Sequence, residues 1–413
     1  MKTKILSLVI SLNFVFFYTN PLQSCTTFCI HTDEELVFGK NYDWMISDGI
    51  VFVNKKDIVK TAFTKKNSPA TWVSKYGSVT FNQFGREFPM GGMNEAGLVV
   101  ELMWLDDTKY PDADERPATG GVLQWIQYQL DNSETIQEVI DTDKLIRIPT
   151  AATPIHFLIT DKYGSTASIE FLDGKLVAHK GETMKFRSLT NDTYEKSIEY
   201  LKNFKEFGGE KDLPNESGSL ERFAKSCSML KNYTKKENRT AVDYGFEILK
   251  DVIQGDATKW SIVYDIKNMQ VYFNTYDNKK IKSIDFAALD FNCTSPVIMI
   301  DINSNLEGNI NNSLTEYNID ANRKLIEDSY NGVDFLKGVS KEDRDLTSTY
   351  PEKLNCKSKS GIEMNYDNND NNDKNYNNEN NSIATSFIIL FGVFLCSVAL
   401  IAGYKGKNKN KKS

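Results

Sequence analysis

Histidine is scarce in this sequence, because His31, His156 and His179 are the only three among 413 residues. None of them pairs at the helical spacing of metal ligands, so a multi-histidine metal centre is disfavoured. The six cysteines include no C-x-x-C pair, which removes the thioredoxin-like and zinc-ribbon signatures. Excess basic charge is also lacking: the net charge of −7 disfavours a nucleic-acid-binding surface. We therefore expect no metal and no nucleic-acid partner. The cysteine chemistry described below requires no organic cofactor, so none is expected either.

The chain has enough apolar residues for a large core, with 40% hydrophobic and 12% aromatic content. Its N-terminus combines two lysines, an apolar stretch over residues 5–18 and a short polar exit before Cys25. This pattern predicts a secretory signal peptide over residues 1–24, cleaved after Ser24.

A second apolar run, over residues 383–404, carries no charge and is long enough to cross a bilayer core of about 30 Å. The basic tail at 405–413 is expected to stay cytosolic. Residues 346–382 are rich in Asn and Asp and predict a polar stalk. The folded catalytic part is thus expected at 25–345, on the lumenal or extracellular side of a single-pass type I membrane protein.

Several sequence features fit such a compartment. Six N-glycosylation sequons occur, at Asn215, Asn232, Asn238, Asn292, Asn311 and Asn380. A disulfide can form among Cys227, Cys293 and Cys356, although the sequence leaves the pairing open.

Periodicity along the folded part predicts strands mixed with separate helical blocks. The strands are expected at Thr26–His31, Leu36–Phe38, Gly97–Trp104, His156–Thr160, Ala167–Phe171, Trp260–Asp265 and Val271–Thr275. The helices are expected at Gly121–Leu130, Ile136–Asp141, Thr193–Phe204, Leu220–Asn232 and Val242–Ile253. This order favours a layered α+β domain over a repeating βαβ barrel.

Cys25 becomes chemically unusual once residues 1–24 are removed. Its thiol, with a reference pKa of about 8.5, then lies beside its own α-amine, whose reference pKa is about 7.7–8.0. A neutral terminal amine can take the thiol proton directly or through one water, so one residue supplies both nucleophile and base. On a strand, Cys25, Thr27 and Cys29 share a face. Cys25 and Cys29 are then about 13 Å apart, too far for a disulfide.

A cysteine after Leu-Gln-Ser also resembles a bacterial lipobox, in which a lipid would occupy the amine that catalysis needs. The first thirty residues fit both interpretations equally. The C-terminal apolar run makes a second membrane anchor redundant and favours the catalytic interpretation.

Six sequence blocks occur in one order: CTTFCI, GKNYDW, GGMNEAGLVVELMWLD, SLTNDTY, SLERF and VYFNTYD. Together they resemble the choloylglycine hydrolase family, which contains conjugated bile acid hydrolases and penicillin V acylases. The resemblance runs from Cys25 to about Asp285. It implies an αββα sandwich of the N-terminal-nucleophile hydrolase type and hydrolysis of a linear amide in a small N-acyl substrate. It also leaves a homo-oligomer possible.

The same resemblance implies roles for individual residues. Cys25 matches the N-terminal nucleophile, and Asp43 matches the aspartate that orients the terminal amine. Asn191 matches the asparagine whose amide donates to the oxyanion. Arg222 matches an arginine near the thiol, where a fixed cation favours the thiolate.

Two positions depart from the commonest family pattern. Lys40 stands where many members have arginine, so the charge is kept and the planar fork is lost. Trp104 stands where bile-acid-cleaving members often have asparagine at the oxyanion site. This version resembles the Gram-negative branch and weakens a specific bile-acid assignment.

Other interpretations of these residues remain open. Asn191 lies in an N-D-T sequon, so a glycan site and an oxyanion donor exclude each other there. Trp44, Trp72 and Trp104 fit either the core or the wall of an acyl pocket. A dipeptidase-like amidase and an inactive membrane-tethered binding protein are the alternative functions.

Overall fold

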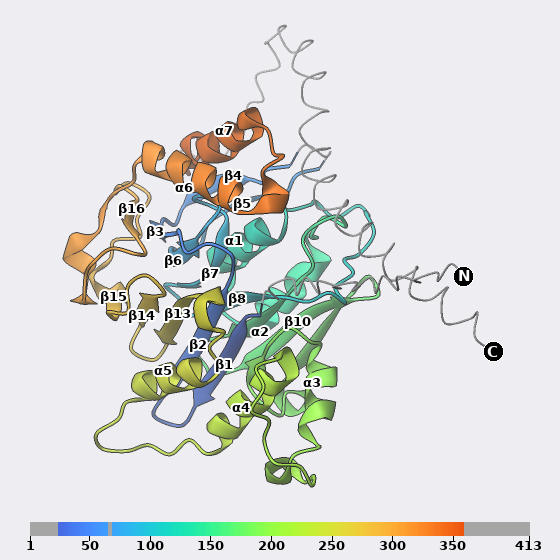
Figure 1. Ribbon diagram of the computed structural model, residues 1–413. Coiled ribbons are helices and arrows are strands. Elements are labelled where there is room, and N and C mark those ends of the chain that lie inside the picture. The colour runs from blue at the N-terminus through green and yellow to red at the C-terminus, as the bar shows by residue number, and fades with distance from the viewer. Residues whose placement is uncertain (1–23, 65–67, 359–413) are drawn as a thin grey trace, which may run out of the picture.

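Two sheets, built almost entirely from antiparallel strand pairs, form the centre of the computed structural model, which describes residues 24–64 and 68–358 (Figure 1). The seven-stranded sheet has the order β12 (Ser188–Leu189), β1 (Thr26–His31), β2 (Leu36–Asp43), β13 (Thr258–Asp265), β14 (Gln270–Thr275), β15 (Lys282–Asp285), β17 (Gly308–Asn309). In this sheet β2 is paired with β1 on one side and β13 on the other.

The nine-stranded sheet has the order β11 (Lys175–Lys180), β10 (Thr166–Leu172), β9 (Ile155–Thr160), β8 (Val99–Trp104), β7 (Pro89–Asn94), β6 (Ser78–Asn82), β3 (Ile50–Asn54), β16 (Ile298–Asp301), β18 (Thr315–Glu316). A third, three-stranded sheet consists of β19 (Asn355–Cys356), β4 (Ile58–Thr61) and β5 (Thr71–Val73).

Strand β1 alternates between two apolar environments, as the period of two in its sequence predicts. Phe28 and Ile30 join the cluster under helix α5 (Ala241–Asp251), whereas Cys25 and Cys29 join the main core between the sheets. Gly39 on β2 lies directly under the Phe28 ring, where a Cβ would come within 2.2 Å of a ring carbon. The glycine of the GKNYD block is therefore needed for the strand pair to pack.

The main core fills the space between the two large sheets with apolar and aromatic side chains. Phe81 on β6 makes edge-on ring contacts with Tyr264 on β13 and Phe273 on β14, at centroid distances of 6.1 and 5.3 Å. Edge-on packing of this kind adds to the stabilisation by apolar burial. One charged side chain, Lys40 of β2, also enters this layer and reaches β8 of the other sheet.

Helices cover the outer faces of both large sheets. Helices α4 (Ser219–Lys231) and α5 (Ala241–Asp251) pack on the seven-stranded sheet, and α1 (Val122–Asn132) and α2 (Ile136–Asp141) pack on the nine-stranded sheet. Helix α3 (Tyr194–Leu201) packs against α4. The αββα sandwich implied by the family resemblance is confirmed.

The hairpin between β7 and β8 is held by a buried polar side chain. Asn94 Oδ1 accepts a hydrogen bond from the backbone N–H of Leu98, and Asn94 Nδ2 donates to the carbonyls of Leu130 and Ser133 at the end of α1. Gly97 in the turn has φ +83°, a conformation that favours glycine. The GGMNEAG block thus joins the hairpin to the helix that covers it.

The last part of the described chain adds two helices, α6 (Ile319–Gly332) and α7 (Lys341–Thr349), which pack on each other near β3 and β4 (Figure 1). After α7, β19 pairs with β4, and a disulfide joins Cys293 to Cys356. The folded part therefore extends past the predicted boundary at residue 345, because α7 runs across this position and β19 follows it. Cys227 is buried and unpaired.

Several sequence predictions fall outside the described residues. These are the signal peptide apart from Ser24, the stalk beyond residue 358, the apolar run at 383–404 and the basic tail. Across residues 24–64 and 68–358, no helix has both the length and the hydropathy needed to span a membrane.

Candidate active site

Cys25 lies at the end of the seven-stranded sheet, just before β1, where the ends of three strands meet. Asp43 is the last residue of β2, and Thr258, the first residue of β13, is paired with it. The Cys25 side chain is 3% exposed, and its thiol is in no disulfide. The thiol therefore occupies a fixed position in a buried site.

Arg222, in the first turns of α4, is completely buried and binds the backbone beside the thiol. Its Nη1 donates to the carbonyl oxygen of Cys25 and to Thr26 Oγ1, both at 2.6 Å. Its Nη2 donates to Asn191 Oδ1 at 3.0 Å, and its Nε donates to the Ser217 carbonyl at 3.2 Å. Four acceptors thus surround the guanidinium, which offsets the cost of burying its charge.

Asn191 follows β12, and its side-chain amide is held on both sides. Because Oδ1 accepts from Arg222, Nδ2 faces the opposite way and donates to the carbonyl oxygen of Trp104 at 2.9 Å. The backbone N–H of Asn191 donates to Ser219 Oγ at 2.9 Å. An amide nitrogen carries two hydrogens, so one N–H of the fixed Nδ2 remains for another acceptor.

The Asp43 carboxyl group is buried, and its two oxygens differ in their partners. Oδ1 accepts a hydrogen bond from Thr258 Oγ1 at 2.5 Å. Oδ2 is buried and accepts no hydrogen bond from the part of the chain that the structure describes. Burial raises the pKa of Asp43 to about 6, although the positive charge of Arg222 opposes the shift. Its open oxygen can accept a hydrogen bond from a further donor.

Lys40 is buried between the sheets. Its Nζ donates to the carbonyl oxygen of Leu102 and lies 3.8 Å from Glu101 Oε2, while Tyr264 donates to Glu101 Oε1 at 2.6 Å. Burial raises the pKa of Glu101 to about 7, and Lys40 opposes that shift. Gly91 makes room for this carboxylate, since a Cβ there would lie 2.3 Å from it.

Competing influences act on the Cys25 thiol. Burial raises its pKa, whereas Lys40, the Asp43 backbone N–H and Arg222 favour the thiolate. Lys40 opposes the rise more strongly than Arg222 does. Because burial prevails, the thiol of the described chain is protonated at neutral pH. Nucleophilic attack then needs a base next to the sulfur.

The sequence analysis assigned no role to His156, which is completely buried next to the Asn191 segment. Its Nε2 lies 2.7 Å from the carbonyl oxygen of Thr190, and its Nδ1 lies 3.2 Å from Glu170 Oε1. Glu170 Oε1 also accepts from the backbone N–H of Tyr194. His156 therefore fixes the peptide just before Asn191. Its place in a strand far from SLTNDTY gave no local signal of this contact.

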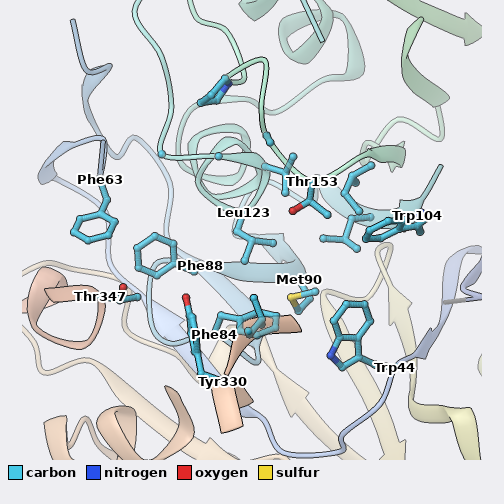
Figure 2. A pocket seen from close by; sticks show the side chains of 18 of the residues that line it. Trp44, Phe63, Phe84, Phe88, Met90, Trp104, Leu123, Thr153, Tyr330 and Thr347 are labelled. Carbon is cyan, nitrogen blue, oxygen red and sulfur yellow. The ribbon is translucent and has the colours of Figure 1, made fainter. Parts of the chain in front are cut away.

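A pocket of about 300 Å³ opens on Cys25 and Asp43 and is lined mainly by apolar side chains (Figure 2). Figure 2 shows Trp44 and Trp104 on one side of this pocket and Phe63 and Thr347 on the opposite side. Trp44 and Trp104 thus line the pocket, as one of the two interpretations expected. Trp72 instead donates from its indole N–H to buried Asp131.

The structure thus brings all six candidate residues together. Asp43, Arg222 and Lys40 act on the Cys25 thiol, Asn191 is bound to Arg222, and Trp104 lines the pocket and accepts from Asn191. Within the described ranges, no group of three or more His, Cys, Asp or Glu side chains is arranged to hold a metal ion. A protonated thiol, an open carboxylate oxygen and a fixed amide N–H are the groups available for chemistry.

Comparisons with known proteins give concordant results. A model of the "Linear amide C-N hydrolases, choloylglycine hydrolase family" matches residues 25–299. A penicillin V acylase of Pectobacterium atrosepticum is 26% identical, and the match covers 53% of this chain and 69% of that protein.

Solved structures share the fold. The penicillin V acylase from Agrobacterium tumefaciens has a TM-score of 0.63 at 26% identity, and the match covers 71% of this chain and 98% of that one. A mutant conjugated bile acid hydrolase from Clostridium perfringens has a TM-score of 0.55 at 20% identity, covering 69% of this chain and 98% of that one. At that identity the second likeness concerns the fold alone.

Proposed function

This chain belongs to the choloylglycine hydrolase family of linear amide C–N hydrolases, and we propose that it cleaves N-acyl amides with Cys25 as an N-terminal nucleophile. The observation that carries the proposal is the open Oδ2 of Asp43, buried beside a protonated thiol at the end of an apolar pocket. A buried carboxylate oxygen without a donor is costly. An α-amino group at Cys25, created by cleavage after Ser24, would supply that donor.

The terminal amine is the base in this mechanism. The thiol pKa is raised by burial, so the sulfur must lose its proton to a neighbour before it attacks. A neutral α-amine on the same residue takes this proton, directly or through one water. Asp43 orients the amine, and Thr258 fixes Asp43 by donating to its other oxygen.

The acylation step forms a bond between Cys25 Sγ and the carbonyl carbon of the substrate. The resulting oxyanion accepts a hydrogen bond from the free N–H of Asn191 Nδ2. Arg222 fixes the direction of this N–H, because it binds Asn191 Oδ1. The protonated amine gives its proton to the leaving nitrogen, and the C–N bond breaks, which leaves a thioester. Water then attacks the thioester with the amine as base, and the products are a carboxylic acid and an amine.

The two buried cations have different parts in this scheme. Lys40 is the charge that most favours the thiolate, so it compensates for the cost of burying the sulfur. Arg222 acts mainly by geometry, because it binds the Cys25 carbonyl and the Asn191 amide together. In this arrangement Asn191 is an oxyanion donor and carries no glycan.

Processing and location complete the proposal. Removal of residues 1–24 creates the nucleophile, and the apolar run at 383–404 anchors the enzyme in a membrane. Four of the sequon asparagines, Asn215, Asn232, Asn238 and Asn292, are exposed on the described surface, whereas Asn311 is half-buried. The described amide of Asn311 is instead paired with the backbone of Asp285.

The test combines sequencing of the mature N-terminus with an amidase assay. We expect the mature chain to begin at Cys25 and to release the amine from N-acyl amides, with penicillin V as one probe and dipeptides as comparison substrates. Cys25→Ala should fold and lose all turnover, whereas Cys29→Ala, which removes a buried thiol from the same strand face, should stay active. Turnover in the alanine variant at Cys25, or a mature chain that starts elsewhere, would refute the mechanism.

A further inference from the structure

The acyl pocket has a second end, formed by residues that follow the family-matched part of the chain. On the premise of the proposed amidase activity, we propose that residues 330–347 act as the end wall of this pocket and make the enzyme select N-acyl amides with an extended, uncharged, apolar acyl group. The catalytic residues decide which bond breaks, and this wall decides how long an acyl chain fits.

The pocket lining is almost free of charge. Asp43, at the thiol end, is the only Asp, Glu, Lys, Arg or His among the described lining residues. The rest of the lining includes the aromatic residues Trp44, Phe63, Phe84, Phe88, Trp104, Tyr330 and Phe335, together with aliphatic side chains. A carboxylate or ammonium on the acyl group would lose its hydration here without gaining a partner, which is costly. An apolar acyl group gains free energy in proportion to the area it buries.

The pocket extends from the nucleophile toward the C-terminal helices. Figure 2 shows Trp44 and Trp104 at one side, with Phe88 and Tyr330 farther across and Thr347 at the opposite side. A linear acyl chain with its carbonyl at Cys25 would therefore run past Met90 and Leu123 toward α7.

The far wall comes from a part of the chain beyond the family match. That match ends at residue 299, and the residues of the far wall all follow it. Tyr330 lies in the last turn of α6, and Phe335 and Leu336 lie in the short turn after it. Leu346 and Thr347 lie on α7. These side chains thus shape the pocket independently of the catalytic blocks.

Specific contacts hold this wall against the sheets. Phe335 packs edge-on against Trp44, and Tyr330 packs edge-on against Phe84, at centroid distances of 6.4 and 5.9 Å. Ser329 Oγ donates to the carbonyl of Gln83 at 2.7 Å, and the whole segment is closed by the Cys293–Cys356 disulfide. A wall fixed in this way can discriminate acyl lengths, because its position does not adapt freely to each chain.

The first experiment measures kcat/KM of the processed full-length protein on straight-chain N-acyl amides that share one fluorogenic amine. We expect about a fourfold rise per added methylene, equivalent to about 0.8 kcal/mol per buried CH₂, up to a length at which the wall is reached and the rate falls. A terminal carboxylate on an acyl chain of the same length should abolish the gain. Equal rates for short and long chains, or for charged and uncharged ends, would overturn the proposal.

The second experiment uses a matched pair of truncations in the C-terminal segment. Leu336 lines the pocket, whereas Leu325 on α6 is equally buried but packs against Ile50, Phe52 and Met299. Leu336→Ala should move the preferred acyl length upward, and Leu325→Ala should leave it unchanged while lowering stability by a similar amount. An identical shift in both variants would show that general loosening, and not the wall, sets the preference.

A third variant, which adds volume to the pocket, keeps the proposal testable even if the truncated variants misfold. Leu346→Trp should shorten the preferred acyl length, so the ratio of kcat/KM for long chains to kcat/KM for short chains should fall. The amidase activity on short acyl amides distinguishes failure of the wall proposal from failure of the proposed amidase function. An enzyme that cleaves short acyl amides without discriminating length keeps the amidase function and refutes the wall, whereas a protein inactive on every acyl amide refutes the amidase function itself.

Discussion

The two ends of the pocket are built on different physical principles. At the thiol end, the buried charged side chains are Arg222, Lys40 and Asp43. Their hydrogen bonds to carbonyl, hydroxyl and amide groups fix the orientation of each of these side chains. At the far end, aromatic rings and aliphatic side chains meet through apolar packing, as Tyr330 does against Phe84.

This difference has consequences for how each end tolerates change. A buried charge that loses one partner leaves the other uncompensated, so substitutions at the thiol end should have large effects on catalysis. Apolar packing is graded, so substitutions at the far end should alter selectivity in small steps. The four predictions below test this contrast, beginning with the largest effect.

Replacing Asn191 by alanine should lower kcat about 10²–10³-fold, because one oriented oxyanion donor is lost. Steady-state kinetics on a short N-acyl amide measure the effect. The control is Asp192→Asn, which alters the neighbouring residue and breaks its ion pair with Lys196 but keeps the Asn191 amide. Equal losses in the two variants would mean that the loop, and not the amide, is needed.

Asp43 should produce an acid limb in the pH profile of kcat/KM. Burial raises its pKa to about 6 in the described chain, so the carboxyl group is ionised above this pH and neutral below it. The ionised form stabilises the ammonium that forms when the neutral amine takes the thiol proton, so activity should fall as pH drops through about 6.

Asp43→Asn should lose about 10²-fold in kcat/KM and shift this limb. Profiles of both enzymes between mildly acidic and mildly basic pH give the comparison. A limb at the same pH in both enzymes would assign it to another group.

Removing the disulfide by Cys293→Ala together with Cys356→Ala should lower the free energy of unfolding by about 2–4 kcal/mol, because the cross-link restrains the unfolded chain. Denaturant unfolding with and without a reducing agent measures this, and the difference from wild type should vanish under reduction. The far wall should discriminate acyl length less sharply, while alkylation of Cys25 stays unchanged. A loss of Cys25 reactivity would contradict the independence of the two ends.

Substitution of His156 should have the smallest effect on kcat, because its side chain acts only by holding the peptide before Asn191. Asparagine at this position cannot reach the Thr190 carbonyl, and loss of about 1 kcal/mol from one hydrogen bond corresponds to about fivefold in kcat. Glutamine, whose amide nitrogen reaches as far as Nε2, should retain wild-type kcat. If KM rises in both variants with kcat unchanged, His156 supports substrate binding instead.

The predicted elements agree best where the local pattern is strong. The predicted strand Thr26–His31 and helix Ile136–Asp141 are confirmed at both ends, because alternation and helical periodicity there match the burial. The strand predicted at Leu36–Phe38 is real but continues to Asp43, since its later residues are polar and form contacts inside the protein.

Several other strands and helices were not predicted from the sequence. Strands β3, β6 and β7 were not predicted, although each is buried throughout, because a short run buried on both faces has no alternation. Strands β4 and β5 were also missed, and they have only four and three residues. Lys60 on β4 is buried against Glu87 and Asp131, an ion-pair environment that no local pattern reveals. Helices α6 and α7 are rich in charged residues and are held by tertiary contacts.

The candidate site was predicted as a set of residues and not as a geometry. Cys25, Asp43, Asn191 and Arg222 came from ordered sequence blocks, and the structure gathers them at one end of a sheet. The sequence contained no sign that Asn191 would bind the Trp104 carbonyl, or that Lys40 would meet Glu101. Those partners lie on strands far away in the chain.

From the sequence by itself, periodicity determined a layered α+β domain, because alternation and helical spacing are local properties. The ordered sequence blocks indicated the family, and the sandwich and the residues that meet at the thiol followed from that resemblance. Only the tertiary structure decided that one oxygen of Asp43 stays open, that His156 supports the Asn191 peptide, and that the C-terminal helices close the pocket. Each of these depends on which surfaces come together when the chain folds. Hydrogen bonds and van der Waals contacts act over a few ångströms in space, whatever the distance along the chain.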